Sequence, residues 1–181
     1  MKTLYLLRHA KSDWNSDFAT DHERGLSPRG IRATERMAKF LSGYGFYADL
    51  CISSTAVRCV DTWKYLNQNS TGFAREYREE PRLYEADRDS LLEMIQSVTN
   101  EVTSLVLVGH NPGLEELGEY LVIGDSVEDE LHNPLFYKFP TSALLGLSLS
   151  VENWRDVSPG HASIIVYWIP GRKGISKRKA S

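Results

Sequence analysis

The stretch LYLLRHAKSDWN, residues 4–15, decides the fold and raises the first question about function. It overlaps an apolar run, TLYLL at 3–7, which is typical of a strand buried on both faces of a parallel sheet. The run ends abruptly at Arg8 and His9, so a guanidinium and an imidazole directly follow a buried strand. We therefore expect both groups to face a ligand at the edge of a sheet.

Apolar runs alternate with helical periodicity along the rest of the chain. Further strands are expected at 48–54, 104–110, 143–151 and 163–169. Helices are expected after the Ser27–Pro28 cap as far as Gly43, over 57–66, over 90–98 and after Asn111–Pro112. The alternation predicts an α/β three-layer sandwich, with a mostly parallel central sheet and helices on both faces.

Length and composition indicate one domain, at 1–170, followed by a basic tail at 171–181 that carries five of the 21 Lys and Arg residues. The tail is expected to be solvated, with docking to an acidic partner as the alternative. A net charge of −3 offers no basic field for nucleic acid or an anionic membrane. Without a membrane-length apolar run or a CxxC motif, the chain is expected to be cytoplasmic, and nothing indicates its oligomeric state.

Three predicted strand ends carry cationic or imidazole groups. The first ends at Arg8 and His9, the second at Ser54 with Arg58 one turn into the next helix, and the third at His110. In a parallel sheet these ends share one edge, where helix N-termini add a partial positive charge. A compact, multiply charged anion fits such a site, and phosphate fits best. The other histidines, at positions 22, 132 and 161, occupy no comparable position.

The two residue types serve different chemical needs. Arginine keeps its charge at any working pH, and its paired donors match phosphate oxygens. Histidine can be neutral near pH 7, so one imidazole can attack phosphorus while the other donates to the oxygens that gain charge. A covalent phosphohistidine splits one hard transfer into two easier ones. The arginines supply the neutralising charge, so no metal or other cofactor is expected.

Four stretches in this order resemble the histidine phosphatase superfamily, also called the phosphoglycerate mutase-like fold: LLRHAKSDWN, ERGLSPRG, SSTAVRCVDT and VGHNPG. Within it the chain most resembles the SixA-type phosphohistidine phosphatases, over roughly residues 3–150. The resemblance implies that His9 is the phosphorylated nucleophile. It implies that the phosphate is bound by Arg8, Arg58, His110, Asn15 and Arg24. The chain departs from the family pattern at Gly25, where SixA-type proteins have proline, and at Ala10, where mutase-type members have glycine.

The resemblance also implies a general acid, and Glu85 in PRLYEAD matches the family's carboxylate. A positioned acid contributes about 10²- to 10⁴-fold to the rate when an alkoxide must leave. The imidazole of phosphohistidine is readily protonated as it leaves, so Glu85 could be dispensable for that substrate. Asp13 and Asp87 are the alternative acids.

The size of the chain bears on the substrate. Small-molecule members of the family carry a helical insertion over the pocket, whereas here only about 25 residues separate Leu66 from Ser90. A minimal fold with an open mouth favours phosphohistidine on a protein, for example on a histidine-phosphotransfer domain. The alternatives are a small-molecule phosphomonoester phosphatase, a mutase and a non-catalytic phosphate- or phosphoprotein-binding module. A cysteine-dependent phosphatase is disfavoured, because six residues rather than five separate Cys51 from Arg58.

Overall fold

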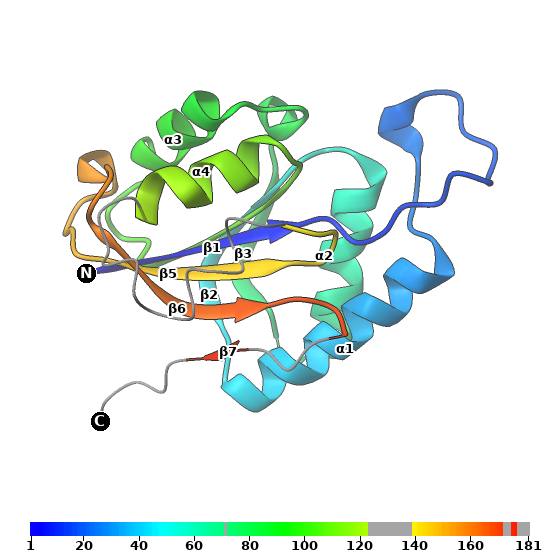
Figure 1. Cartoon of the computed structure of the whole chain (residues 1–181), viewed down its shortest axis with the longest axis horizontal. Helices are drawn as coiled ribbons and strands as arrows, with labels where there is room; N and C mark the ends of the chain where they lie inside the picture. The colour runs from blue at the N-terminus through cyan, green and yellow to red at the C-terminus, as the bar shows by residue number, and fades with distance from the viewer. Residues whose placement is uncertain (71, 123–138, 172–174, 177–181) are drawn as a thin grey trace.

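The structure is a computed structural model, which describes residues 1–70, 72–122, 139–171 and 175–176 (Figure 1). Within these ranges the strands are β1 (Lys2–Arg8), β2 (Ala48–Ser53), β3 (Ala74–Glu79), β4 (Ser104–Gly109), β5 (Leu144–Leu149), β6 (Ala162–Trp168) and β7 (Ile175–Ser176). The α-helices are α1 (Pro28–Tyr44), α2 (Val57–Asn69), α3 (Arg88–Gln96) and α4 (Gly113–Val122). Three short 3-10 helices are η1 (Asp21–Glu23), η2 (Pro81–Leu83) and η3 (Trp154–Asp156).

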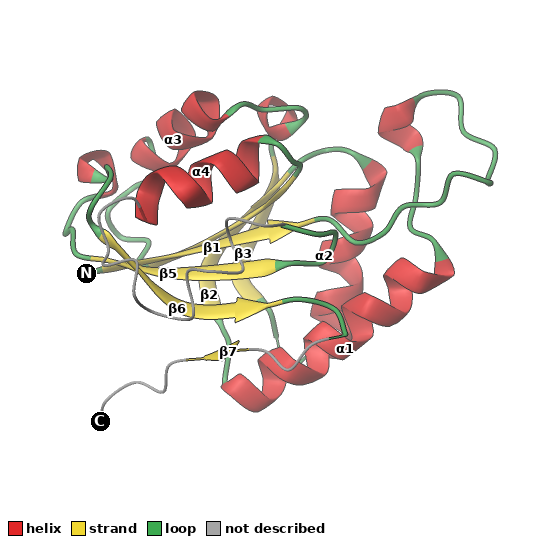
Figure 2. Cartoon of the chain, in the orientation of Figure 1, coloured by secondary structure: helices red, strands yellow, loops and turns green. Residues whose placement is uncertain are grey.

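The described strands form one sheet in the order β3-β2-β4-β1-β5-β6-β7. The first four strands in this order are parallel to one another. After them, β5 pairs antiparallel with β1, β6 with β5, and β7 with β6. Figure 2 shows the helices arranged in layers on the two faces of this sheet, with α3 and α4 together on one face. The α/β sandwich predicted from the sequence is confirmed, and no large helical insertion interrupts the described part.

The position of β1 in the sheet explains its central apolar run, Leu4 to Leu7. Leu4 and Leu6 belong to the buried cluster that contains side chains of α3 and α4. Tyr5 and Leu7 belong to the cluster on the other face, with side chains of α1 and α2. Successive side chains of a strand point to opposite faces, so a strand covered on both faces needs apolar residues throughout.

Helix α1 begins as expected, but it is terminated by Gly45 rather than by the predicted Gly43. The Ser27 hydroxyl accepts a hydrogen bond from the Gly30 N–H (3.1 Å), and Pro28 is the first helical residue. The helix runs through Gly43 and stops at Gly45, which has a left-handed φ of 69°. Glycine adopts that conformation without a steric penalty, so Gly45 rather than Gly43 terminates the helix.

We expect Gly30→Ala to destabilise the fold by about 1–3 kcal/mol, because a Cβ there would lie 2.2 Å from the Lys11 carbonyl oxygen. Gly43→Ala is the matched control in the same helix. Its Cβ meets no atom within 4 Å, and alanine is the better helix former by about 1 kcal/mol. Urea unfolding of both variants tests this, and equal effects would contradict it.

Two other elements differ from the sequence-based expectation. The sequence analysis missed β3 because its residues, AREYRE, are mostly charged and exposed, as an edge strand allows. Helix α4 starts at Gly113, and the Asn111 side chain donates to the Phe139 carbonyl (3.0 Å) and to the Glu115 carboxylate. Asn111 thus ties the start of α4 to the chain preceding β5.

The predicted tail at 171–181 lies mostly outside the described residues. Its residues Ile175–Ser176 form β7, which pairs with β6. Among the described residues, no helix has the length and apolar character needed to cross a membrane.

Candidate active site

Three neighbouring strands of the sheet, β2, β4 and β1, end at the same edge. Arg8 lies opposite Gly109 in the register of β1 and β4, and the His9 N–H donates to the Gly109 carbonyl (3.1 Å). His9 and His110 therefore follow two adjacent strand ends, and their ring centroids are 5.1 Å apart. The predicted convergence of the two imidazoles is confirmed.

His9 is held as a neutral imidazole with a free lone pair. The ring is buried, and its Nδ1 lies 2.8 Å from the Ala10 carbonyl oxygen. A carbonyl only accepts hydrogen bonds, so Nδ1 carries the hydrogen and the lone pair is on Nε2. Burial, reinforced by the nearby charges of Arg58 and Arg8, lowers the pKa of His9 to about 3. At neutral pH, Nε2 is thus a competent nucleophile.

His110 is held through its Nε2 atom, whereas His9 is held through Nδ1. Its Nε2 lies 2.9 Å from the Ser54 hydroxyl, and its Nδ1 lies 3.5 Å from Arg58 Nη2. Burial and then the charge of Arg58 lower the pKa of His110 to about 4. Ser54 therefore sets the ring orientation and leaves Nδ1 beside the guanidinium.

Arg58 is buried and Arg8 is half-buried, and each guanidinium has an N–H group without a hydrogen-bond partner in the described part of the chain. Arg58 Nη1 donates to the Asp21 carbonyl (2.6 Å), and Nη2 donates to Asp21 Oδ2 (2.9 Å). Arg8 Nη1 donates to the Phe139 carbonyl (2.7 Å). The Nε atoms of both arginines are buried and have no hydrogen-bond partner among the described residues. A buried donor without a hydrogen-bond partner is costly.

A family model for the histidine phosphatase superfamily (branch 1) matches residues 4–111. This chain belongs to the histidine phosphatase superfamily. The matched range includes Arg8, His9, Arg58 and His110, all four of the residues that converge at the edge of the sheet. An uncharacterized protein of Mycobacterium tuberculosis is 33% identical over 164 residues, which cover 91% of this chain and 99% of the relative.

Solved structures agree with this assignment. A protein of Agrobacterium tumefaciens, assigned as the phosphohistidine phosphatase SixA, is 33% identical with a TM-score of 0.75. The match covers 94% of this chain and 99% of that protein. The protein histidine phosphatase SixA complexed with tungstate shares the fold at 20% identity, with a TM-score of 0.70 and coverage of 96% of each chain. The SixA-type resemblance is confirmed, and it supports a phosphatase.

The remaining predicted phosphate ligands lie further out in this histidine phosphatase. Arg24 is buried, its Nε and Nη2 donate to Asp21 Oδ1 (3.0 and 2.7 Å), and its Nη1 donates to the Ser12 hydroxyl. Its guanidinium also stacks on Trp14, 3.6 Å from the ring centroid. Asn15 is exposed, and no contact among the described residues joins it to the two histidines. Arg24 therefore organises the loop between β1 and α1.

The three candidate acids, Asp13, Glu85 and Asp87, lie in different surroundings. Asp87 caps α3 by accepting from the Ser90 N–H (2.8 Å), and Asp13 Oδ1 accepts from the Asn15 N–H (2.9 Å). Glu85 is exposed and lines a cavity of about 590 Å³ together with Tyr84. The Tyr84 ring in turn lies 5.5 Å from the His110 ring. Glu85 thus lies one residue from a wall of the site.

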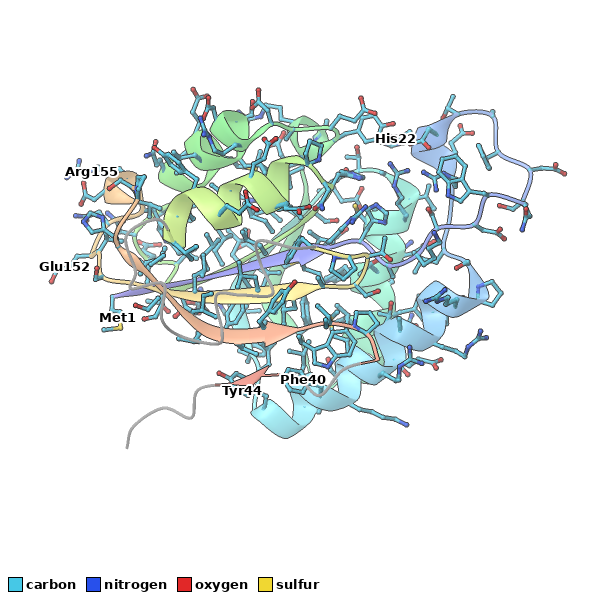
Figure 3. The ribbon with its side chains drawn as sticks, viewed as in Figure 1. Met1, His22, Phe40, Tyr44, Glu152 and Arg155 are labelled. Carbon is cyan, nitrogen blue, oxygen red and sulfur yellow. The ribbon has the colours of Figure 1, made fainter. Side chains whose placement is uncertain are left out.

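Sequence analysis missed three residues around the pocket: Asp21, His22 and Tyr84. His22 Nε2 lies 2.9 Å from the Thr55 hydroxyl, and its ring is 4.9 Å from that of Tyr84. Figure 3 shows His22 at the end of the molecule opposite Met1. Residue 132, another histidine, lies outside the described residues. The spacing of Asp21 and Arg24, three residues apart, was the available signal for an ion pair.

Neither cysteine suits a nucleophilic role. Cys59 Sγ lies 3.5 Å from His110 Nε2, but burial raises the pKa of the Cys59 thiol to about 12. Burial also raises the pKa of Cys51. Both thiols are protonated at neutral pH, which disfavours a cysteine-dependent mechanism. Within the described ranges, no group of three or more His, Cys, Asp or Glu side chains could hold a metal ion.

The stability of the fold should fall in mild acid. The pKa values of His9 and His110 are about 3 and about 4, below the usual value of about 6.5 in an unfolded chain. The unfolded state therefore binds more protons, so this stabilisation is complete above about pH 6.5 and is lost as the pH falls towards 4 and 3. Urea unfolding at about pH 7 and about pH 5 measures the loss.

The double variant His9→Gln/His110→Gln should show a smaller loss of stability over that interval. His161→Gln is the control, because His161 is exposed and lies outside the site. Equal wild-type stability at the two pH values would contradict the pKa assignment.

Proposed function

We propose that this histidine phosphatase hydrolyses phosphorylated histidine on a protein, through a phosphohistidine intermediate on His9. The observation that carries the proposal is the pair of neutral imidazoles, with ring centroids 5.1 Å apart, under the influence of the charges of Arg8 and Arg58. A phosphoryl group there would accept hydrogen bonds from both arginines and lie within reach of His9 Nε2.

The reaction proceeds in two balanced steps. His9 Nε2 attacks phosphorus, a new N–P bond forms, and the bond from phosphorus to the leaving imidazole breaks as that imidazole takes up a proton from solvent water. Water then attacks the phosphorus of phospho-His9 and the N–P bond breaks; the protons of the water leave with the inorganic phosphate, and His9 returns to its neutral form. Arg8, Arg58 and His110 stabilise the charge on the phosphoryl oxygens in both steps.

A protein substrate is supported by the short connection between α2 and α3. Its described residues, 70 and 72–87, hold β3 and η2 and form no α-helix that would close over the pocket. The 33% identical structure from Agrobacterium tumefaciens carries a SixA assignment, which supports the same substrate class.

Glu85 offers the test between this substrate and a small phosphomonoester. The experiment compares wild type and Glu85→Gln on a histidine-phosphorylated phosphotransfer protein and on an alkyl phosphate. If phosphohistidine protein is the substrate, wild type should strongly prefer it over the alkyl phosphate. Glu85→Gln should then change the turnover of the phosphohistidine protein by less than about threefold. A preference for the alkyl phosphate, with a loss of about 10²-fold or more in Glu85→Gln, would favour the small-molecule alternative. Stoichiometric binding without turnover would indicate a binding module.

A further inference from the structure

One carboxylate connects three separate segments of the chain at the edge of the pocket. Asp21 lies in η1, within the loop between β1 and α1. Its side chain accepts hydrogen bonds from Arg24 in the same loop (2.7 Å), from Arg58 in α2 (2.9 Å) and from the hydroxyl of Tyr84 after η2 (3.2 Å). The chain thus uses one half-exposed loop residue to hold two buried arginines.

We propose that Asp21 is a positioning residue that orients Arg58 towards the transferred phosphoryl group, an inference that rests on the phosphate pocket proposed above. Arg58 donates to Asp21 at two points, from Nη1 to the backbone carbonyl (2.6 Å) and from Nη2 to the carboxylate. A planar guanidinium held at two points has a fixed rotation. The fixed plane leaves Nε free and keeps Nη2 within 3.5 Å of His110 Nδ1.

The electrostatics of Asp21 suit this role. Burial by itself would raise the pKa of its carboxyl, but the hydrogen bond from Arg24 and the charge of Arg58 outweigh it and lower the pKa. Asp21 therefore stays charged at neutral pH. Arg8 is held differently, by the neutral carbonyl of Phe139. Asp21 is the charged group that aligns Arg58.

A competing explanation is that Asp21 merely fills the phosphate position on Arg58 until a ligand displaces it. The two explanations predict opposite changes in phosphate affinity. Loss of a competing anion would tighten phosphate binding, whereas loss of a positioning group would weaken it. The two-point contact favours positioning, because Asp21 holds both terminal nitrogens of Arg58 while Nη2 stays 3.5 Å from His110 Nδ1.

The test measures the Kd for inorganic phosphate and the kcat/KM for an aryl phosphate in Asp21→Ala and Asp21→Asn. We expect Asp21→Ala to weaken phosphate binding about tenfold and to lower kcat/KM about 10²-fold, and Asp21→Asn to have a smaller effect. Asp17→Asn is the matched control, since Asp17 is an exposed carboxylate in the same loop. Because the Asp21 side chain is 42% exposed, added formate should restore part of the activity of Asp21→Ala.

A double-substitution cycle separates positioning from a general structural effect. If Asp21 acts through Arg58, Asp21→Ala should cost less than about threefold in an Arg58→Lys background. An equal loss in both backgrounds, tighter phosphate binding, or unchanged phosphate affinity and kcat/KM in Asp21→Ala would overturn the proposal. These readouts need no phosphohistidine protein. If wild type binds phosphate but does not hydrolyse phosphohistidine protein, only the proposed substrate is wrong. If wild type binds no phosphate, both the proposed function and the positioning role of Asp21 are overturned.

Discussion

His9→Ala is expected to lower turnover by on the order of 10⁴-fold or more, on a phosphohistidine protein and on an aryl phosphate alike. The substitution removes the lone pair of Nε2, and no other described group near the phosphate space is placed to replace it. The neighbouring imidazole of His110 is engaged by Ser54 through Nε2, and the nearby thiol of Cys59 is protonated at neutral pH. Steady-state kinetics on both substrates measure the loss.

The covalent intermediate gives a second readout for the same substitution. Wild type mixed briefly with substrate and quenched in alkali should carry acid-labile phosphate, and His9→Ala should carry none. His161→Ala is the control for the loss of an imidazole away from the pocket. Residual turnover above about 1% in His9→Ala, or acid-labile phosphate elsewhere in the chain, would contradict the nucleophile assignment.

The sequence predicted the four central residues because each follows from local rules. An apolar run locates a strand, and the residue after the run lies at the edge of the sheet. The order β2-β4-β1 then places Arg8, His9, Arg58 and His110 together. Strand recognition and the parallel arrangement suffice for Arg8, His9 and His110, whereas Arg58 lies one turn into α2 and also needed the helix that follows β2.

The role of Asp21 could not be predicted in the same way. Its position depends on the path of the irregular loop between β1 and α1, which is set by contacts with α2 and with Tyr84. Such long-range contacts leave no periodic pattern in the sequence. The i, i+3 spacing to Arg24 indicated an ion pair, but not that the same carboxylate reaches Arg58.

The contacts made by backbone groups of the site are even harder to predict from the sequence. The Ser142 N–H donates to the carbonyls of Arg8 (3.2 Å) and His9 (3.1 Å), and Ser142 has a left-handed φ of 64°. The Phe139 carbonyl accepts from Arg8 and Asn111. A peptide group is the same in every residue, so only the structure reveals that this turn holds Arg8 and His9.

Arg58→Ala is expected to lower kcat/KM by about 10³-fold or more, because the variant loses a charged donor to the transferred phosphoryl group. It also leaves the carboxylate of Asp21 with one fewer charge partner. Arg58→Lys keeps the charge but lacks the planar fork, so it should still lose about 10²-fold. Arg155→Ala is the control, since Arg155 is exposed at the opposite end of the molecule from His22 (Figure 3).

The signature of Arg58→Ala should differ from that of His9→Ala. The nucleophile remains, so acid-labile phosphate should still form on His9, but slowly, when the reaction is quenched at long times. The affinity for inorganic phosphate should fall together with kcat/KM, because Arg58 contacts the phosphoryl oxygens both in the bound state and in the transition state. An Arg58→Ala variant with unchanged phosphate affinity would show that the unpaired Nε faces something other than the anion, and the phosphate pocket would have to be placed elsewhere.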